Sequence, residues 1–297
     1  MKIRSFIYII LAGVLWGSQT LFVHFLKPYG FSSLELTSVR AIVSFCAIAL
    51  FALLSNRDAF KIKFKDLFII LGVGICLFAT AAFYYIAMDM TSTATSVVIM
   101  YLSPVYVMIY SVLFFREKFS FSKLAALALV IGGSVLVSGA FGGEEGFTFN
   151  LVGVLFAVLS GLTLASYNIF TKISSARKCK PLTTTLYGFM FMALSSLLFA
   201  NPAAVVEKAS AAPIITIPLL LGIGLVTCIL PYFLYNLAVE TVPVGTAASL
   251  AVIDPMAATV FSVFIGEKPN AFSIVGVVLV LCAIVLLGLA EGRHEEA

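Results

Sequence analysis

Long apolar segments separated by short polar connections run along the whole chain. A helix that crosses the hydrocarbon core of a membrane needs about 20 predominantly apolar residues. Ten segments satisfy this requirement, and in chain order they are Ser5–Leu26, Leu34–Leu54, Leu67–Met88, Thr91–Phe115, Phe121–Phe141, Asn150–Thr171, Leu182–Ala200, Ile214–Val239, Pro243–Ile265 and Ala271–Ala290. Because the apolar runs are continuous and do not alternate with polar positions, the pattern excludes a membrane β-barrel. It predicts an all-α integral membrane protein with ten transmembrane helices.

The composition places most of the chain in a lipid environment. Hydrophobic residues make up 62% of the sequence and charged residues 11%, and the mean hydropathy is +1.13. A soluble domain carries about 25% charged residues, so a water-soluble fold could not hide this much apolar surface. The basic start, Met1–Arg4, leads directly into a segment of spanning length, which predicts a retained first helix and not a cleaved signal peptide. No basic run interleaved with aromatic residues occurs, so a nucleic-acid partner is not expected.

Lysine and arginine residues predict the orientation, because they are enriched in cytoplasmic connections. With the amino terminus placed in the cytoplasm, 14 of the 18 lysines and arginines fall on the cytoplasmic side. The basic connections at 56–65 and 172–181 contain more than half of these 14 residues. We therefore expect both termini to be cytoplasmic.

The two halves of the chain are related by an internal repeat. A shift of 151 positions aligns residues that chance rarely pairs, among them Tyr84 with Tyr235, Asp89 with Glu240, Thr95 with Thr246 and Pro104 with Pro255. Each half has five apolar segments, and because five is odd the second half enters the membrane from the opposite side. The expected domains are a first five-helix repeat (1–141), a connecting loop (142–149), and a second five-helix repeat with a short cytoplasmic tail (150–297). Inverted repeats are typical of secondary transporters, whose solute binds near the membrane midplane.

With this architecture, the chain resembles the EamA-type group of the drug/metabolite transporter superfamily over nearly its whole length. The motifs that carry the resemblance are Trp16-Gly17, Ser38-Val39-Arg40, Tyr84-Tyr85-Ile86-Ala87, Ser103-Pro104, Arg116-Glu117-Lys118 and Gly266-Glu267-Lys268-Pro269. The resemblance implies a basket-like bundle in a bacterial cytoplasmic (inner) membrane, with a central cavity lined by the first, third, fourth, sixth, eighth and ninth helices. It also implies export of amino acids, related metabolites or drugs, although other members import or exchange nucleotide-linked and methyl-donor metabolites.

Two charged residues lie inside predicted spans. Asp254 is about eleven residues into the ninth span, near the bilayer centre. Such residues usually face a cavity and take part in transport, so Asp254 is a candidate site for an amine or a proton, the alternative being a structural carboxylate. Arg40 lies near the outer end of the second span, where it could bind a carboxylate or serve a structural role by snorkelling to the interface. A direct pair between Arg40 and Asp254 is compatible with the pattern but does not follow from it.

Pro104 and Pro255 occupy equivalent positions of the two halves. Each removes a backbone donor and frees a carbonyl group, which is tolerated in a membrane where a cavity, water or side chains satisfy it. They therefore predict either hinges at the solute site or static kinks. The residue before Pro104 is Ser103, and it aligns with Asp254, so the charge breaks the symmetry of the repeat at this position.

Aromatic and amide side chains complete the candidate solute site, and they are Trp16, Gln19, Tyr84, Tyr101, Tyr167, Tyr235, Asn168 and Asn236. Trp16 is the only tryptophan and lies in mid-span, away from the interfacial aromatic belt, and Gln19 follows it by one turn. Belt anchoring is an alternative for the three tyrosines nearer span ends, Tyr84, Tyr167 and Tyr235. The two asparagines could instead bond neighbouring helices.

Other motifs limit the function. The pair Gly13 and Gly17 predicts close helix packing. Two histidines without an acidic cluster predict no metal site, and the lack of a phosphate-binding loop motif predicts no ATP motor. A membrane enzyme or lipid-handling protein would need a cluster of catalytic residues, and the sequence contains no such pattern.

We therefore expect a non-enzymatic secondary transporter without a cofactor, whose partners are a small-molecule solute and the lipid bilayer. The expected cargo is an amino acid or a related amphiphilic amine or drug, exported by alternating access. Import or exchange of a metabolite on the same fold is the alternative. Proton coupling, and the choice between a monomer and a homodimer, stay open at this level.

Overall fold

The computed structural model describes residues 2–115, 121–137, 150–266 and 270–296, and these ranges contain helices and short connections but no strand. In chain order the elements are α1 Lys2–Gly17, α2 Gln19–Leu26, η1 Lys27–Tyr29, α3 Ser33–Ser55, η2 Arg57–Phe60, α4 Phe64–Met90, α5 Thr93–Met100, α6 Ser103–Phe115, α7 Phe121–Val137, α8 Leu151–Ala176, α9 Pro181–Leu197, α10 Pro202–Ala211, α11 Pro213–Gly224, η3 Leu225–Ile229, α12 Leu230–Ala238, α13 Val244–Ala251, α14 Ile253–Phe264 and α15 Ala271–Glu296. The all-α prediction is confirmed. The 142–149 loop and the motif residues 116–118 and 267–269 lie outside the described residues.

Each predicted span coincides with one helix or with consecutive helices of the described ranges. Seven helical segments there are long and apolar enough to cross a membrane, and the bent pair α9–α10 raises the number to eight if it forms one broken span. The described apolar parts of α7 and α15, Leu124–Val137 and Ala271–Leu286, are shorter. A multi-pass membrane protein is therefore established, whereas the total of ten crossings stays a prediction.

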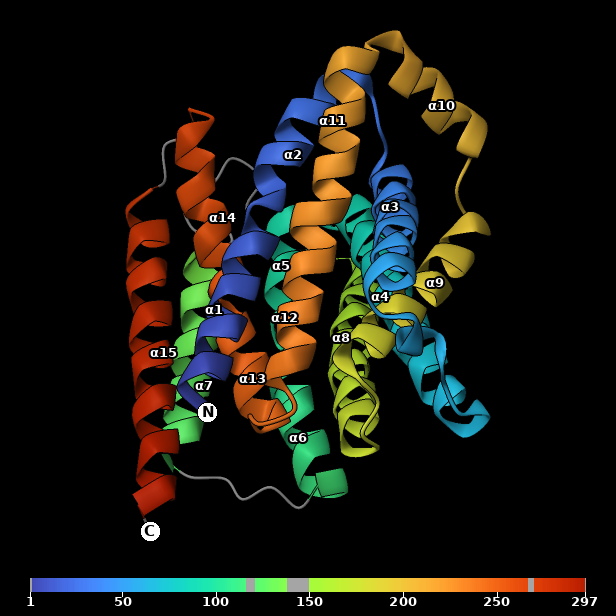
Figure 1. Ribbon diagram of the computed structural model, residues 1–297. Coiled ribbons are helices and arrows are strands. Elements are labelled where there is room, and N and C mark those ends of the chain that lie inside the picture. The colour runs from blue at the N-terminus through green and yellow to red at the C-terminus, as the bar shows by residue number, and fades with distance from the viewer. Residues whose placement is uncertain (1, 116–120, 138–149, 267–269, 297) are drawn as a thin grey trace.

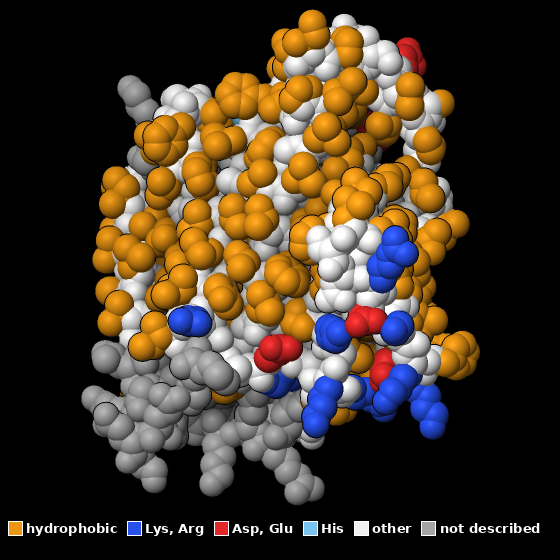
Figure 2. Space-filling view, in the orientation of Figure 1, with side chains coloured by type: hydrophobic (Ala, Val, Ile, Leu, Met, Phe, Trp, Pro, Cys, Tyr) orange, Lys and Arg blue, Asp and Glu red, His pale blue; other side chains and the backbone are white. Residues whose placement is uncertain are grey.

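The helices stand side by side in a bundle, and α1 begins at the same end of the bundle at which α15 ends (Figure 1). Hydrophobic side chains cover the sides of the bundle, whereas lysine and arginine side chains gather towards that end (Figure 2). Within α3 and α11, for example, Leu50 is 58% exposed and Leu221 is 47% exposed. Contact with lipid is favourable for such an apolar surface, whereas its exposure to water would be unfavourable.

Two of the predicted spans are interrupted at positions related by the repeat. Proline lacks an N–H and clashes with the carbonyl group four residues earlier. Counting back four residues from Pro104 and Pro255 gives Met100 and Ala251, which are the last residues of α5 and α13. The residues at the two breaks, Tyr101 (φ −73°, ψ 2°) and Val252 (φ −69°, ψ 4°), have nearly the same backbone conformation. Both predicted interruptions are thus present, and they have the same local cause.

The helices of the two halves interlock. Helix α1 of the first half packs against α12 of the second half. The repeat relates α1 to α8 and α11–α12 to α4, and α8 packs against α4 in the same way. Helices α3 and α9 form a pair, as do α7 and α15. Each half therefore depends on the other to bury its helices.

The predicted close packing at Gly13 and Gly17 is confirmed, and the partner is α14. A Cβ atom at Gly17 would lie 2.6 Å from the Cβ atom of Ala257 and 2.7 Å from the carbonyl oxygen of Asp254. Two backbones can approach this closely only where no side chain intervenes. The glycine pair thus places α1 directly against the first turn of α14.

The connection between the seventh and eighth predicted spans contains a further helix, α10. Asn201 accepts a hydrogen bond from the backbone N–H of Ala204 and so caps this helix. The ammonium group of Lys208 contacts both carboxylate oxygens of Glu35 on α3, at 2.9 and 2.7 Å. The helix bends away from α9 by 97°. The segment is too short to span a membrane and contains Glu207 and Lys208, so it gave no spanning signal, and its capping residue was the available clue.

The approach of α1 to α14 leads to a stability prediction. We expect Gly17→Ala to lower the stability by about 1–3 kcal/mol, because the added methyl group meets backbone atoms that cannot rotate away. Gly132→Ala is the matched control, since nothing lies within 4 Å of a Cβ atom there, and it should be neutral or slightly stabilising. Thermal unfolding of both variants in detergent measures the difference, and equal midpoints would contradict the packing argument.

Candidate functional site

The two interrupted spans meet at Asp254. Asp254 is the second residue of α14, directly after the α13–α14 break, and Tyr101 lies in the α5–α6 break. The phenol of Tyr101 donates a hydrogen bond to Oδ2 of Asp254 at 3.1 Å. The repeat-related breaks therefore contribute one partner each to a single polar contact in the middle of the bundle.

Asp254 combines deep placement with accessibility. The flanking residues Ile253 and Pro255 are buried, yet Asp254 itself keeps accessible surface. Its oxygen Oδ1 has no hydrogen-bond partner among the described residues and is not fully enclosed, so it can accept a hydrogen bond from a solute.

Arg40 lies near Asp254 without contacting it. The two charges are close enough to attract each other, but they form no ion pair within 4.0 Å. Instead Nε of Arg40 donates to Sγ of Cys228 at 3.1 Å, and the residue is only 9% exposed. The terminal guanidinium nitrogens bind no other described residue and are not fully enclosed. A buried arginine thus presents free donors beside a half-buried carboxylate, and the snorkelling alternative is wrong.

Aromatic rings surround the two charges. Tyr84 lies near Asp254, and Tyr85 and Tyr232 lie near Arg40. The rings of Tyr84 and Tyr85 are 5.5 Å apart, and the rings of Trp16 and Tyr232 are 5.0 Å apart in edge-to-face geometry. Such rings provide apolar and cation-binding surface for a solute that carries a positive charge.

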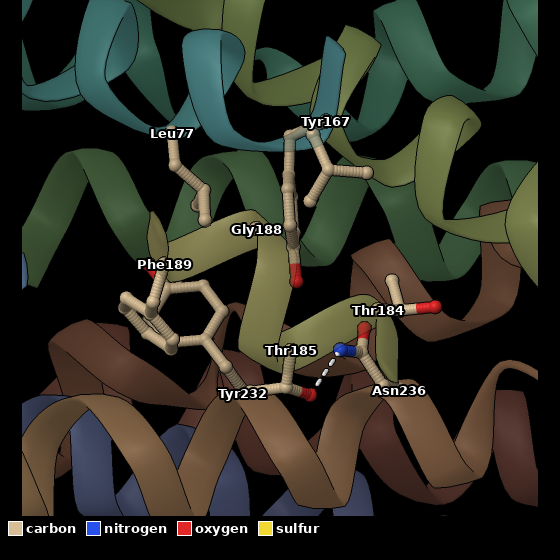
Figure 3. A pocket seen from close by; sticks show the side chains of 9 residues that line it. Leu77, Tyr167, Thr184, Thr185, Gly188, Phe189, Tyr232 and Asn236 are labelled. Atoms are coloured by element: carbon tan, nitrogen blue, oxygen red, sulfur yellow. Dashed lines mark hydrogen bonds between the residues drawn. The ribbon is translucent and has the colours of Figure 1, made fainter. Parts of the chain in front are cut away.

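A second polar region lies between α4, α8, α9 and α12 (Figure 3). Its pocket is lined by Val73, Leu77, Tyr167, Thr184, Thr185, Gly188, Phe189, Tyr232 and Asn236. Nδ2 of Asn236 donates to Oγ1 of Thr185 at 2.8 Å. In this conformation the pocket has space for about one water molecule. Tyr232 belongs both to this pocket and to the surroundings of Arg40, so the two regions share a wall.

The structure gathers most of the predicted site residues. Asp254, Tyr101, Tyr84, Arg40 and Trp16 belong to the region around the two charges, with Ser103, Pro104 and Pro255 at the two helix breaks. Asn236 lines the second pocket, and Tyr235 donates a hydrogen bond to Asn168 at its edge. Gln19, the first residue of α2, is half-buried and has no hydrogen bond to the described residues.

The belt alternative was wrong for two tyrosines. Tyr235 is fully buried and Tyr167 is 3% exposed, so neither reaches a membrane interface. The expectation that the asparagines bond neighbouring helices is confirmed by the Tyr235–Asn168 and Asn236–Thr185 hydrogen bonds.

Sequence reasoning missed Tyr85, Tyr232 and Cys228. Their spans are rich in apolar and aromatic residues, and nothing in the local sequence separates a cavity-facing ring from a packed one. The internal repeat did contain one usable signal, because Tyr167 aligns with Trp16, and both rings pack against Tyr232. Within the described residues no three His, Cys, Asp or Glu side chains gather as metal ligands.

Comparison with known proteins gives relatives of the same kind along the whole chain. A transporter of unassigned substrate from Archaeoglobus fulgidus is 26% identical over 94% of this chain and 94% of its own length. A protein from Streptantibioticus cattleyicolor named as a probable terminal-alkyne amino-acid exporter is 25% identical over 68% of this chain and 67% of its own length. A solved crystal structure superposes with a TM-score of 0.78 at 16% identity, covering 99% of this chain and all of the other, which shows a shared fold.

The model of the EamA-like transporter family matches residues 3–139 and residues 151–289. The two matched segments correspond to the two halves related by the 151-position shift. Together they cover nearly all of the sequence, including both helix breaks and every predicted site residue. The protein is therefore a membrane transporter that belongs to the EamA-like transporter family.

Proposed function

We propose that the protein is a secondary transporter that exports a small amphiphilic amine or amino acid by alternating access. The observation that carries the proposal is the placement of Asp254, a half-buried carboxylate at a helix break deep in the bundle, beside an arginine with free donors. A charge inside a membrane protein is costly and persists where it serves a cavity or a transport path. The name of the Streptantibioticus relative agrees with this choice of cargo and direction.

The donor and acceptor atoms of the site that lack hydrogen-bond partners among the described residues suggest how a solute binds. An ammonium group can bind to Oδ1 of Asp254, while Tyr101 keeps the second carboxylate oxygen hydrogen-bonded. A carboxylate group can accept from the terminal nitrogens of Arg40, because the contact with Cys228 occupies only Nε. The rings of Tyr84, Tyr85 and Trp16 then contact the apolar part of the solute. A proton and an ammonium group would compete for Asp254, which offers a simple route to proton coupling.

The proposed architecture is ten helices in two inverted five-helix repeats, with both termini on the cytoplasmic side of a bacterial inner membrane. Its support is the near-identical geometry of the α5–α6 and α13–α14 breaks, the interlocked packing of α1 with α12 and of α8 with α4, and the lysines and arginines at the end where the chain begins. Inverted halves can exchange their conformations, and this exchange is the physical basis of alternating access.

Repeat-related positions differ in burial, as one state of such a cycle requires. Helix α13 is buried from Val244 to Leu250, whereas Val97–Met100 of the corresponding α5 keep accessible surface. Tyr235 is fully buried, whereas its repeat partner Tyr84 is half-buried. Since α13 lies nearer the basic end (Figure 1), we propose that this conformation is closed on the cytoplasmic side and faces outward.

Polar contacts join the two halves at the closed end. The hydroxyl groups of Ser5 and Thr241 are 2.7 Å apart, and Arg177 contacts Asp66 at 3.1 Å. The ammonium group of Lys172 donates to the carbonyl groups of Val239 and Val242 and so fixes the turn before α13. An inward-facing state requires the first two of these contacts to break.

Neutralising Asp254 tests the proposal directly. We expect Asp254→Asn to lower flux in liposomes at least tenfold, since a charge-assisted contact contributes about 1.5–3 kcal/mol. Flux is measured across a panel of amino acids and amines, with and without a proton gradient. Asp58→Asn, which removes an exposed carboxylate outside the spans, is the matched control and should retain wild-type flux. Wild-type flux in Asp254→Asn would falsify the assignment of this site.

Two solutes that differ only by a carboxylate group can distinguish a binding role of Arg40 from a structural one. We expect Arg40→Gln to lower the flux of an amino acid about tenfold or more, while the flux of the corresponding amine without a carboxylate changes little. The same liposomes measured with each solute in turn give the comparison. An equal loss for both solutes would mean that Arg40 is structural.

A cross-link at the basic end tests the proposed cycle. In a background in which every native cysteine except the buried Cys228 is replaced, we expect a disulfide between Ser5→Cys and Thr241→Cys to stop flux and a reductant to restore it. The pair Ser174→Cys and Thr184→Cys is the control, because these hydroxyl groups are also 2.7 Å apart but belong to consecutive helices of one half. Full flux through the protein cross-linked at positions 5 and 241 would contradict the closed-gate assignment.

A further inference from the structure

We propose that the pocket of Figure 3 is a second subsite of the transport path, which binds a hydroxyl group at the uncharged end of the solute. The inference rests on the proposed function and extends it. It concerns Tyr167, which was one of the aromatic candidates, and Tyr232, which was not predicted, and it gives Asn236 a specific role.

Two buried polar atoms of the pocket lack partners. The hydroxyl group of Tyr167 and Oδ1 of Asn236 are fully enclosed and make no hydrogen bond within the described residues. Their residues are 3% and 5% exposed. Burying a polar group without a partner is unfavourable, and folded proteins rarely leave such groups unsatisfied. The pocket is thus built for an occupant that supplies the missing hydrogen bonds.

The geometry fixes the direction of these atoms. Nδ2 of Asn236 is engaged with Thr185 at 2.8 Å, which orients the amide and leaves Oδ1 as a free acceptor. In Figure 3 the oxygen atoms of Tyr167 and Asn236 point into the space between α8 and α12. The hydroxyl group of Thr171 lies close to that of Tyr167, but the two do not reach hydrogen-bonding geometry, and both lack a partner among the described residues.

The lining of the pocket selects against charge. It consists of apolar side chains, aromatic rings, threonine hydroxyls and one amide, and it contains no charged residue. A carboxylate or ammonium group would lose its hydration there without gaining a counter-charge. A hydroxyl or an amide fits better, because either can donate to Oδ1 of Asn236 and also bond the phenol of Tyr167.

Tyr232 connects this pocket to the charged region. Its ring contacts Tyr167 at 5.7 Å and Trp16 at 5.0 Å, in edge-to-face geometry in both cases. Trp16 and Tyr167 are repeat partners, and the indole nitrogen of Trp16 is also enclosed without a hydrogen bond to the described residues. Tyr232 also lies close enough to Arg40 and Asp254 to interact with their charges. One solute can therefore place its charged end at Arg40 and Asp254 and its uncharged end beside Tyr232 in the pocket.

The size of the pocket limits the group that enters. Space for about one water molecule accommodates a single hydroxyl group. Bound water has the same hydrogen-bonding chemistry and is the alternative occupant, so the test must separate a solute group from water.

The test compares solutes that differ by one hydroxyl group. Flux of threonine and valine, and of tyrosine and phenylalanine, is measured in liposomes that contain the full-length protein. We expect the wild type to favour the hydroxyl member of at least one pair about fivefold. Tyr167→Phe should reduce this ratio to about one, with the loss falling on the hydroxyl member of the pair, because the deleted hydroxyl group makes no hydrogen bond within the described residues. Asn236→Leu should reduce the ratio as well.

Tyr187→Phe is the matched control, since it deletes a tyrosine hydroxyl group that bonds the carbonyl group of Phe60 and does not line the pocket. It should keep the wild-type ratio. The subsite is overturned if the wild type shows no preference, if Tyr167→Phe lowers both members of a pair equally, as a water or packing site would, or if Tyr187→Phe has the same effect as Tyr167→Phe. A changed ratio in Tyr167→Phe together with full flux in Asp254→Asn would support the subsite and contradict the binding role of Asp254. No flux for any member of the pairs would overturn both.

Discussion

A carboxylate deep in a membrane protein requires its surroundings to supply what water supplies elsewhere, and the centre of this bundle is organised around that requirement. Asp254 must have hydrogen-bond donors and accessible space, because an unsolvated charge in hydrocarbon is costly. Tyr101 supplies one donor, and Arg40 contributes a favourable charge at a distance that leaves both groups available. The helix breaks are what allow this arrangement, since an uninterrupted helix would not open its backbone at mid-membrane.

The same requirement explains why small residues and prolines occur together here. Pro255 ends α13 four residues before it and starts α14 beside Asp254, while Gly17 lets α1 approach the carbonyl group of Asp254. The close contact of α1 with α14 holds the carboxylate in position, and we propose that the break before it is a hinge at which the backbone reorients. In this proposal, stability and mobility belong to neighbouring residues. A substitution that fills the glycine contact therefore acts on the position of the site as well as on packing.

Much of this structure follows from local sequence signals. Apolar length located the helices, Pro104 and Pro255 located the breaks, and Gly13 and Gly17 located a close contact. These features depend on backbone geometry within a few residues. The contact between Tyr101 and Asp254 could not be predicted in the same way, because it depends on α6 packing beside α13. Tyr232 escaped prediction because its role comes from its neighbours on α1 and α8, and Tyr167 and Tyr235 were misleading because position along a span does not indicate the direction of a side chain.

The departures from symmetry carry most of the functional information. A symmetric repeat would place equivalent residues in equivalent surroundings, yet Tyr84 keeps accessible surface where Tyr235 is enclosed, and Asp254 stands where the other half has Ser103. In the transport cycle that we propose, the difference in burial reverses as the halves exchange conformations. The difference in residue type cannot reverse, and we propose that it serves the solute. The same reasoning applies to Tyr232, which has Trp16 on one side and its repeat partner Tyr167 on the other. The two residues give the two sides of Tyr232 different hydrogen-bonding chemistry. The site that we propose requires such a difference, because it binds the two ends of a solute differently.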